Sequence, residues 1–177
     1  VRDMNLQQVH QADAGGGEKV PLFEEVLDLA RHRAQVLVEV KSDHIAERVV
    51  QAIADAGAEE QVVLQSFNPQ TVQRLKLLAP HLPASLLVGQ FPTTPSRVRA
   101  RRLVAQVLEV GANALSIWHA SLTPPFIEEM RKRGIAVWAW TVDEDIIMRD
   151  LAMMGVQGII TNYPDHLNQV LDDLVGD

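Results

Sequence analysis

Two opposite charges end an apolar run that begins at residue 36. The run reads Val36-Leu37-Val38-Glu39-Val40-Lys41, and its β-branched residues predict a short strand. Because successive side chains of a strand point to opposite faces, Glu39 and Lys41 share one face. A carboxylate in this position could bind a hard divalent cation, and an ammonium beside it could stabilise a phosphate or a developing negative charge. The alternative, equally open from position alone, is a structural ion pair at a strand edge.

Two tryptophans lie on one face of a later predicted strand. The stretch Trp138-Ala139-Trp140-Thr141-Val142 alternates in the way that places both indoles on the same side. Trp140, nearer the strand end, could line a substrate pocket. Ordinary core packing is the competing and more common role for such rings.

A third group of polar residues follows the last predicted strand, in Thr161-Asn162-Tyr163-Pro164-Asp165. Asn162 or Asp165 is expected to cap the helix that begins there, because short polar side chains accept hydrogen bonds from the first free N–H groups. The helix start could also hold an anion.

Other common catalytic and binding signatures are missing from the chain. The six histidines are scattered, and only His44 and His119 directly follow predicted strands, without an acid/base or metal-binding spacing. Gly15-Gly16-Gly17 lacks the preceding strand that a dinucleotide-binding loop requires. There is no cysteine, which excludes disulfides and thiol chemistry.

Six strands, each followed by a helix, are needed to position these groups. The predicted strands cover residues 36–41, 62–67, 84–89, 114–118, 136–142 and 158–161. Helices are expected from Pro21, over 44–56, over 69–78, after a Pro/Thr-rich loop at 90–95 up to about 111, over 123–134, over 143–155 with Asp143 as the cap, and from Pro164 onward; residues 1–20 are expected to be loop or partial helix.

This alternation of apolar strands and helices predicts a parallel sheet covered by helices. The two architectures that fit are a doubly wound sheet and a (β/α)8 barrel. A spacing of 22 to 30 residues between strand starts is compatible with a leucine-rich repeat, but its Leu/Asn consensus is absent. A complete barrel needs eight units and typically about 250 residues, so 177 residues leave it about two units short.

Charge and hydropathy exclude several classes of partner. The net charge of −7 argues against a nucleic-acid surface, and the one basic cluster, Arg97, Arg99, Arg101 and Arg102, falls in a predicted helix as a solvated face. No apolar run approaches the length of a membrane span, and no signal peptide is present. The chain begins at Val1, as expected of a fragment. A cytoplasmic location is the favoured expectation.

Several short stretches, in order along almost the whole chain, resemble the glycerophosphodiester phosphodiesterase family. Each stretch is a weak signal alone, and the ordered set is strong. They are Val20-Pro21-Leu22-Phe23-Glu24-Glu25-Val26-Leu27, Glu39-Val40-Lys41, Gln65-Ser66-Phe67-Asn68-Pro69, Trp140-Thr141-Val142-Asp143, Gly155-Val156-Gln157-Gly158-Ile159-Ile160-Thr161-Asn162 and Tyr163-Pro164-Asp165.

The resemblance implies a TIM-type (β/α)8 barrel that hydrolyses small-molecule glycerophosphodiesters to an alcohol and sn-glycerol 3-phosphate, with Ca²⁺ or Mg²⁺ as cofactor. By the same resemblance, Glu39 matches a metal ligand and Lys41 matches the lysine beside the substrate phosphate. Trp140 matches an aromatic residue of the substrate pocket, and Phe67 matches a residue near its mouth.

Departures from the family pattern are as informative as the matches. The family's His-Arg-Gly and His-Asp motifs, which carry its catalytic histidines, are absent from the 177 residues, and so is its Glu-x-Asp metal pair. The first two βα units are therefore expected to be missing. Asp143 stands where the family usually has Asn, and Asn162 stands where it usually has Asp.

The expected organisation is a single domain over residues 1–177, forming the C-terminal part of a phosphodiesterase barrel. Without the histidines, this chain alone is expected to be weakly active or inactive, since proton transfer contributes about 10²–10⁴-fold to such reactions. Two alternatives remain. One is a non-catalytic truncated barrel that acts as a binding or assembly module, forming a homo-oligomer through exposed edges. The other is an unrelated doubly wound protein.

Overall fold

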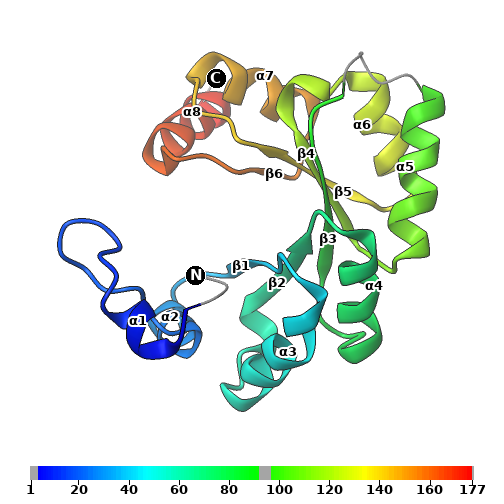
Figure 1. Ribbon diagram of the computed structural model, residues 1–177. Coiled ribbons are helices and arrows are strands. Elements are labelled where there is room, and N and C mark those ends of the chain that lie inside the picture. The colour runs from blue at the N-terminus through cyan, green and yellow to red at the C-terminus, as the bar shows by residue number, and fades with distance from the viewer. Residues whose placement is uncertain (1–3, 92–96, 177) are drawn as a thin grey trace.

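A computed structural model describes residues 4–91 and 97–176 and shows six strands that form one parallel sheet (Figure 1). The predicted loop at 90–95 lies largely outside the described residues. The strands are β1 (Val36–Glu39), β2 (Val62–Ser66), β3 (Ala84–Val88), β4 (Ala114–Trp118), β5 (Ala136–Trp140) and β6 (Gly158–Ile159).

A helix follows every strand, as the alternating pattern predicted. The α-helices are α1 (Leu6–His10), α2 (Phe23–Ala30), α3 (Ala46–Asp55), α4 (Pro69–Leu78), α5 (Arg97–Glu109), α6 (Pro124–Arg131), α7 (Asp145–Met154) and α8 (Pro164–Gly176), with short 3-10 turns at Asp43–Ile45, Glu59–Gln61 and His119–Ser121. The first twenty residues thus hold a partial helix. Five of the strands end one or two residues earlier than expected, whereas β4 ends at Trp118 as predicted.

Strand order decides between the two architectures. The sheet runs β1-β2-β3-β4-β5-β6, so every strand pairs with its neighbours in sequence and the order never reverses. A doubly wound sheet requires a reversal, whereas a barrel adds each strand beside the last. Figure 1 shows the sheet curled into an open half-barrel with the helices outside it. The doubly wound alternative is therefore wrong.

The convex face of the sheet is the core of the molecule. Side chains of β2 to β5 on this face are almost completely buried under the helices, including Leu64, Leu115 and Val137 at 0% exposure. Ser66, on the same side, is buried at 1% exposure, and its hydroxyl donates to the carbonyl of Val40 at 2.6 Å. This hydrogen bond ties the end of β2 to the first residue after β1.

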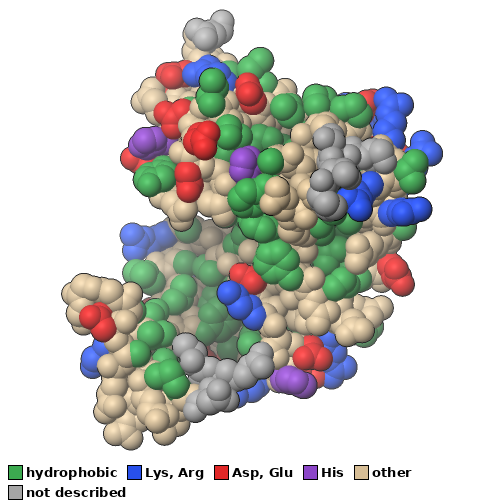
Figure 2. Space-filling view, turned by 45° about the horizontal axis from the view of Figure 1, so that its top comes forward, with side chains coloured by type: hydrophobic (Ala, Val, Ile, Leu, Met, Phe, Trp, Pro, Cys, Tyr) green, Lys and Arg blue, Asp and Glu red, His purple; other side chains and the backbone are tan. Residues whose placement is uncertain are grey.

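The concave face carries the alternate residues of each strand and is less covered at β1 and just after β2, whereas Ser85 and Ser116 in its middle are buried. Leu37 of β1 is 36% exposed and Phe67, just after β2, is 50% exposed. Figure 2 shows hydrophobic side chains lining a hollow between the N-terminal helices and the lobe of α7 and α8. In a closed barrel these side chains would fill the interior. In this chain they face an open space.

Candidate active site

Glu39 and Lys41 lie together at the carboxyl end of β1, as their spacing predicted. Glu39 is the last residue of the strand, and its carboxylate Oε2 is 3.8 Å from Lys41 Nζ. The side chain of Glu39 is 32% exposed and that of Lys41 is 79% exposed. Both groups reach solvent on the concave face, so a ligand has access to this ion pair. Carboxyl ends of parallel strands are where active sites of this architecture form.

A chain of buried polar side chains lies next to Glu39. Gln65 is beside Glu39 in the β1–β2 ladder, and its Oε1 accepts from Ser116 Oγ at 3.3 Å. Ser116 Oγ is also 2.7 Å from Ser85 Oγ. The three side chains are at most 8% exposed, so the concave face has a polar interior layer on β2, β3 and β4. Sequence analysis missed this layer, although its residues share strand parity with Glu39.

Phe67, Trp118 and Trp140 form an aromatic cluster at the mouth of the half-barrel. The ring of Trp140 meets that of Phe67 at a centroid distance of 5.6 Å and 88°, and that of Trp118 at 5.5 Å and 79°. Phe67 comes from the end of β2 and Trp140 from β5, so the contact spans the sheet. The structure thus brings together the two residues that the family resemblance had singled out, and it adds Trp118.

Trp140 also keeps an unused hydrogen-bond donor. Its Nε1 is buried and has no partner among the described residues. Trp138, two residues earlier on the same face, instead packs across Gly158 of β6, where an added Cβ would lie 2.7 Å from its Cδ1. The two tryptophans therefore differ in role: Trp138 fills the interior, whereas Trp140 borders the mouth.

Asp143 joins the ends of β5 and β6 instead of capping α7. Its Oδ1 accepts from the Asn162 backbone N–H at 2.9 Å and from Thr161 Oγ1 at 3.1 Å, and its Oδ2 accepts from Asn162 Nδ2 at 2.9 Å. The predicted capping role of Asp143 is wrong, because Glu144 occupies the cap position of α7 and the Asp143 carboxylate is engaged at the ends of β5 and β6. Of the two residues predicted to cap the last helix, Asn162 donates its Nδ2 to Asp143, and Asp165 lies in the first turn of α8. These hydrogen bonds, the Asn162 backbone N–H first, hold the pKa of Asp143 below its usual value.

The two departures from the family pattern are thus in direct contact. A carboxylate at 143 facing an amide at 162 is the reverse of the arrangement that the resemblance implies, Asn first and Asp second. Since the pair needs one acceptor and one donor, exchanging the two residue types preserves the hydrogen bond.

One histidine contacts the aromatic cluster of this site, and another lies in an exposed pair after β1. His119 packs against Trp118 at a centroid distance of 4.8 Å, and His44 Nδ1 lies 3.8 Å from Asp43 in an exposed pair. Over residues 4–91 and 97–176, no three His, Asp or Glu side chains are close enough to hold a metal ion together. Glu39 is accordingly a single candidate ligand and does not form a metal site with other described residues.

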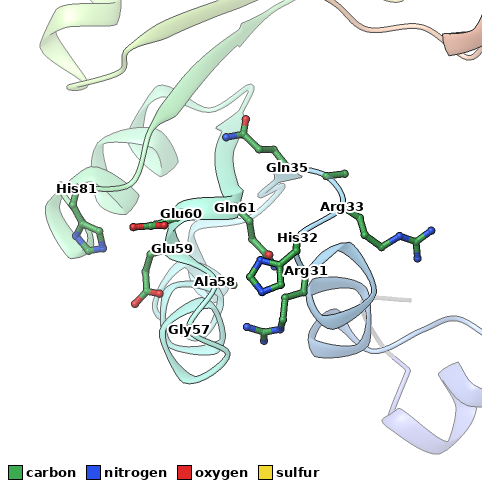
Figure 3. Close-up of a pocket in the computed structure, with 11 residues that line it drawn as sticks. Arg31, His32, Arg33, Gln35, Gly57, Ala58, Glu59, Glu60, Gln61 and His81 are labelled. Carbon is green, nitrogen blue, oxygen red and sulfur yellow. The ribbon is translucent and has the colours of Figure 1, made fainter.

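A cavity of about 850 Å³ lies at the opposite ends of the strands (Figure 3). It is formed by the α2–β1 and α3–β2 connections, with both charge signs on its wall. Hydrogen bonds from Arg31 Nη2 to Ala56 O at 2.9 Å and from Gln61 Nε2 to Leu27 O at 2.8 Å tie these connections together. The amino ends of barrel strands serve stability, so this cavity is separate from the candidate site.

Comparison with known proteins explains the combination of half-barrel, Glu39–Lys41 pair and aromatic mouth. The model described as the glycerophosphoryl diester phosphodiesterase family matches residues 1–166. The chain belongs to this family. Its architecture is accordingly that of a TIM-type α/β barrel with six βα units in place, and the homologues of this family are phosphodiesterases.

Individual relatives support the same assignment. A protein of Caldanaerobacter subterraneus named glycerophosphodiester phosphodiesterase is 29% identical over 94% of this chain and 71% of its own length. The Bacillus subtilis protein YhdW is 30% identical, with 94% of this chain and 71% of its own length covered. This chain therefore spans about 71% of these two relatives.

Solved structures reproduce the fold. A Silicibacter pomeroyi protein described as a putative glycerophosphoryl diester phosphodiesterase superposes with a TM-score of 0.79 at 27% identity, covering 90% of this chain and 58% of that structure. A glycerophosphodiester phosphodiesterase from Parabacteroides distasonis gives a TM-score of 0.83 at 22% identity, covering 97% of this chain and 72% of that structure. In the described part of this chain, no helix has both the length and the apolar character to cross a membrane.

Proposed function

We propose that this chain provides the phosphate-binding and alcohol-binding walls of an enzyme that hydrolyses glycerophosphodiesters to an alcohol and sn-glycerol 3-phosphate. The observation that carries the proposal is the exposed Glu39–Lys41 pair at the carboxyl edge of a sheet that the family model covers. A structural neighbour from Oleispira antarctica is described as a phosphodiesterase in complex with the product sn-glycerol-3-phosphate, which supports this product.

Lys41 is proposed to stabilise the phosphate during the reaction. Water attacks phosphorus, the bond from phosphorus to the alcohol oxygen breaks, and that oxygen takes a proton. Negative charge grows on the non-bridging oxygens in the transition state. An ammonium on a solvent-exposed stem, fixed at its base by the strand end, can follow those oxygens and offset their charge. Phe67 and Trp140 would contact the alcohol side of the substrate.

Glu39 is proposed to supply one oxygen ligand to a divalent cation, Ca²⁺ or Mg²⁺. Such cations take six or more oxygen ligands, several of them from protein in a tight site. The described residues offer one carboxylate at this position, so they do not hold a cation by themselves. We therefore propose that the isolated chain binds the cation weakly and that its hydrolytic rate is low or absent.

The single domain is likewise proposed to be the C-terminal part of a larger barrel. A chimaeric protein tests this idea: the segment of a family member that carries the His-Arg-Gly and His-Asp motifs is placed ahead of Val1. We expect metal-dependent hydrolysis by the chimaera and at least about a hundredfold less by the 177-residue chain, because the histidines supply that much through proton transfer. A folded chimaera without activity contradicts the proposal.

Two variants of the chimaera assign the roles. Glu39→Gln keeps the size of the side chain and removes its charge, so it should weaken the binding of Mg²⁺ in calorimetry and abolish most activity. Lys41→Met should lower kcat with little change in the unfolding temperature, because Lys41 is 79% exposed. Unchanged Mg²⁺ binding in Glu39→Gln would remove Glu39 from the metal site.

A second function is favoured by the free edges of the sheet. Strands β1 and β6 are its two ends, and each has unpaired backbone groups on its outer side. Pairing of these edges between two copies would complete the hydrogen bonding and give a homo-oligomer. Light scattering during gel filtration distinguishes the cases: a stable dimer of 39 kDa without hydrolysis by the chimaera would favour an assembly module over an enzyme, taking the chain as 19.6 kDa.

A further inference from the structure

Charge is distributed unevenly over the outer surface of the half-barrel. Residues 91–140 hold seven Lys and Arg against three Asp and Glu, a net charge of +4, whereas residues 141–177 hold one Arg against eight Asp and Glu, a net charge of −7. Figure 2 shows acidic side chains gathered over the lobe of α7 and α8, and basic side chains gathered at the opposite edge, over α5. The outer surface therefore has a basic side and an acidic side.

Helix α5 exposes a basic face. One side of this helix is buried in the core, whereas Val98, Arg102 and Ala105 are exposed to solvent. These three residues follow the i, i+4, i+7 spacing that places side chains on one side of a helix, and we call them the basic face. Val98 is 60% exposed, and Arg102 forms no salt bridge within residues 4–91 and 97–176. Glu109, the last residue of α5, lies on the same side one turn beyond Ala105.

Helix α7 exposes a face of the same pattern and the opposite charge. Ile146, Asp150 and Met153 have the same i, i+4, i+7 spacing, and we call them the acidic face. Ile146 is 71% exposed and Met153 is 72% exposed. Asp150 forms no salt bridge with any other described residue, whereas the adjacent Arg149 is paired with Asp173 of α8 at 3.5 Å. Two large apolar side chains therefore flank a carboxylate that has no ion-pair partner in the described chain.

We propose that the basic face of one copy of this chain binds the acidic face of a second copy. Each face spans two helical turns and places a charge between two apolar side chains, and the two charges are opposite. When the helices pack on each other, the apolar residues of one face cover those of the other while Arg102 meets Asp150. The chain itself thus carries the charge and the spacing that the basic face requires, which identifies a second copy as the partner. This association goes beyond the proposed hydrolysis and does not depend on it.

The barrel geometry makes this association run head to tail. Helices α5 and α7 belong to units that are two apart in the sheet order. Eight units complete a barrel, so each unit turns the outer surface by about 45° and the two faces point about 90° apart. A single two-fold axis therefore does not bring both pairs of faces together between the same two copies. Each copy instead uses its basic face on one neighbour and its acidic face on another, which lets the assembly grow beyond a dimer.

Sedimentation velocity of the 177-residue chain over a range of concentrations tests the proposal. At pH 7 and about 0.02 M sodium chloride, we expect self-association with a Kd of about 0.1–1 mM and a mass that rises past the dimer. At about 0.5 M sodium chloride the Kd should be at least about fivefold weaker, because salt screens charges at the surface. Pairing of the β1 and β6 edges depends on backbone hydrogen bonds and should not respond to salt in this way.

Charge reversal then localises the contact. Arg102→Glu alone or Asp150→Lys alone places like charges opposite each other and should weaken association by about tenfold or more. The double variant Arg102→Glu/Asp150→Lys restores opposite charges and keeps the net charge of −7, so its Kd should return to within about twofold of the parent value. Arg48→Glu, an exposed position on α3, makes the same change in net charge as Arg102→Glu and should have no effect. Circular dichroism checks the fold of each variant.

A parent chain that stays monomeric at about 1 mM in low salt overturns the proposal. The proposal is also wrong if association survives both single reversals, since the contact then lies elsewhere, or if the double variant does not recover. Phosphatidylglycerol vesicles provide the last comparison. Binding of the parent to these vesicles, lost in Arg102→Glu and without any self-association, would make an anionic lipid surface the partner instead of a second copy. Hydrolysis by the chimaera, present or absent, leaves these outcomes unchanged.

Discussion

The two faces of the sheet differ in burial at β1 and at the carboxyl ends of the strands. On the convex face, residues such as Leu115 and Ile117 of β4 are 0% exposed beneath the helices. On the concave face, Leu37 and Phe67 are 36% and 50% exposed, and Figure 2 shows an open hollow. The difference indicates that the helix-covered convex face supplies most of the apolar packing of this chain. The concave face is left to bind something, and it carries all the candidate site residues.

Matched leucine-to-alanine substitutions on the two faces should show the largest difference in the free energy of unfolding. Leu115→Ala leaves a cavity in a fully buried layer and is expected to cost about 2–5 kcal/mol of unfolding free energy. Leu37→Ala removes a side chain that is already partly solvated, with an expected cost below about 1 kcal/mol. Urea unfolding followed by circular dichroism measures both. Equal costs would mean that the concave face is covered in solution, for example by a second copy.

The contact between Gly158 and Trp138 gives the next prediction. A methyl group at residue 158 would lie 2.7 Å from the indole, closer than packing allows. Gly158→Ala is therefore expected to cost about 1–3 kcal/mol and to move the fluorescence maximum of the chain as Trp138 shifts. Gly89→Ala is the matched control, because its added methyl meets nothing within 4 Å. If Gly158→Ala changes neither the free energy of unfolding nor the fluorescence maximum, Trp138 is free to move away from residue 158.

Sequence reasoning identified the strands, the helices and the pair Glu39–Lys41, because each depends on local pattern. Period-two alternation fixes which residues share a face, and buried parallel strands are continuous apolar runs. The aromatic cluster was found only in part. Trp140 was singled out from the alternation of its strand and Phe67 through the family resemblance, whereas Trp118 was counted simply as the end of a strand. Nothing local shows that rings from β2, β4 and β5 converge.

The capping error at Asp143 has the same origin. A polar residue before a helix fits the local rule for a cap, and Asp143 satisfies it. The curl of the sheet instead brings the ends of β5 and β6 together, and the side chains of Asp143 and Asn162 bond across nineteen positions of sequence. Whether such a polar residue caps its helix depends on contacts with distant segments, which local sequence patterns do not reveal.

Breaking the chain of buried polar side chains should have an intermediate effect on the free energy of unfolding. Ser116→Ala removes the hydroxyl that links Gln65 and Ser85, leaving both with buried polar atoms that lack a partner. We expect a loss of about 1–3 kcal/mol in the free energy of unfolding. The double variant Ser85→Ala/Ser116→Ala removes both hydroxyls and should cost less than the sum of the single changes. Strict additivity would show that the two serines do not interact in solution.

The smallest effect on stability is expected at the Asp143–Asn162 pair. It is measured as the dependence of the unfolding temperature on pH. Hydrogen bonds lower the pKa of Asp143 in the folded chain, so its carboxylate contributes to the free energy of unfolding. This contribution is complete above the pKa of an unfolded aspartate, about 3.9, and is lost as the pH falls through the lower pKa of the folded state. Asn162→Asp should reverse this trend. Two facing carboxylates repel, which raises one pKa, so the variant is least stable relative to the parent chain near neutral pH and recovers on acidification.

The reciprocal double variant Asp143→Asn/Asn162→Asp then tests whether the two positions form one unit. It restores one carboxylate and one amide, so its unfolding temperature at pH 7 should return close to that of the parent, although Asn162→Asp alone lowers it. Recovery would show that the order of the two residue types is interchangeable at this edge of the sheet. A double variant no more stable than Asn162→Asp would mean that Asp143 is required at its own position, for its bonds to the backbone of residue 162 and to Thr161.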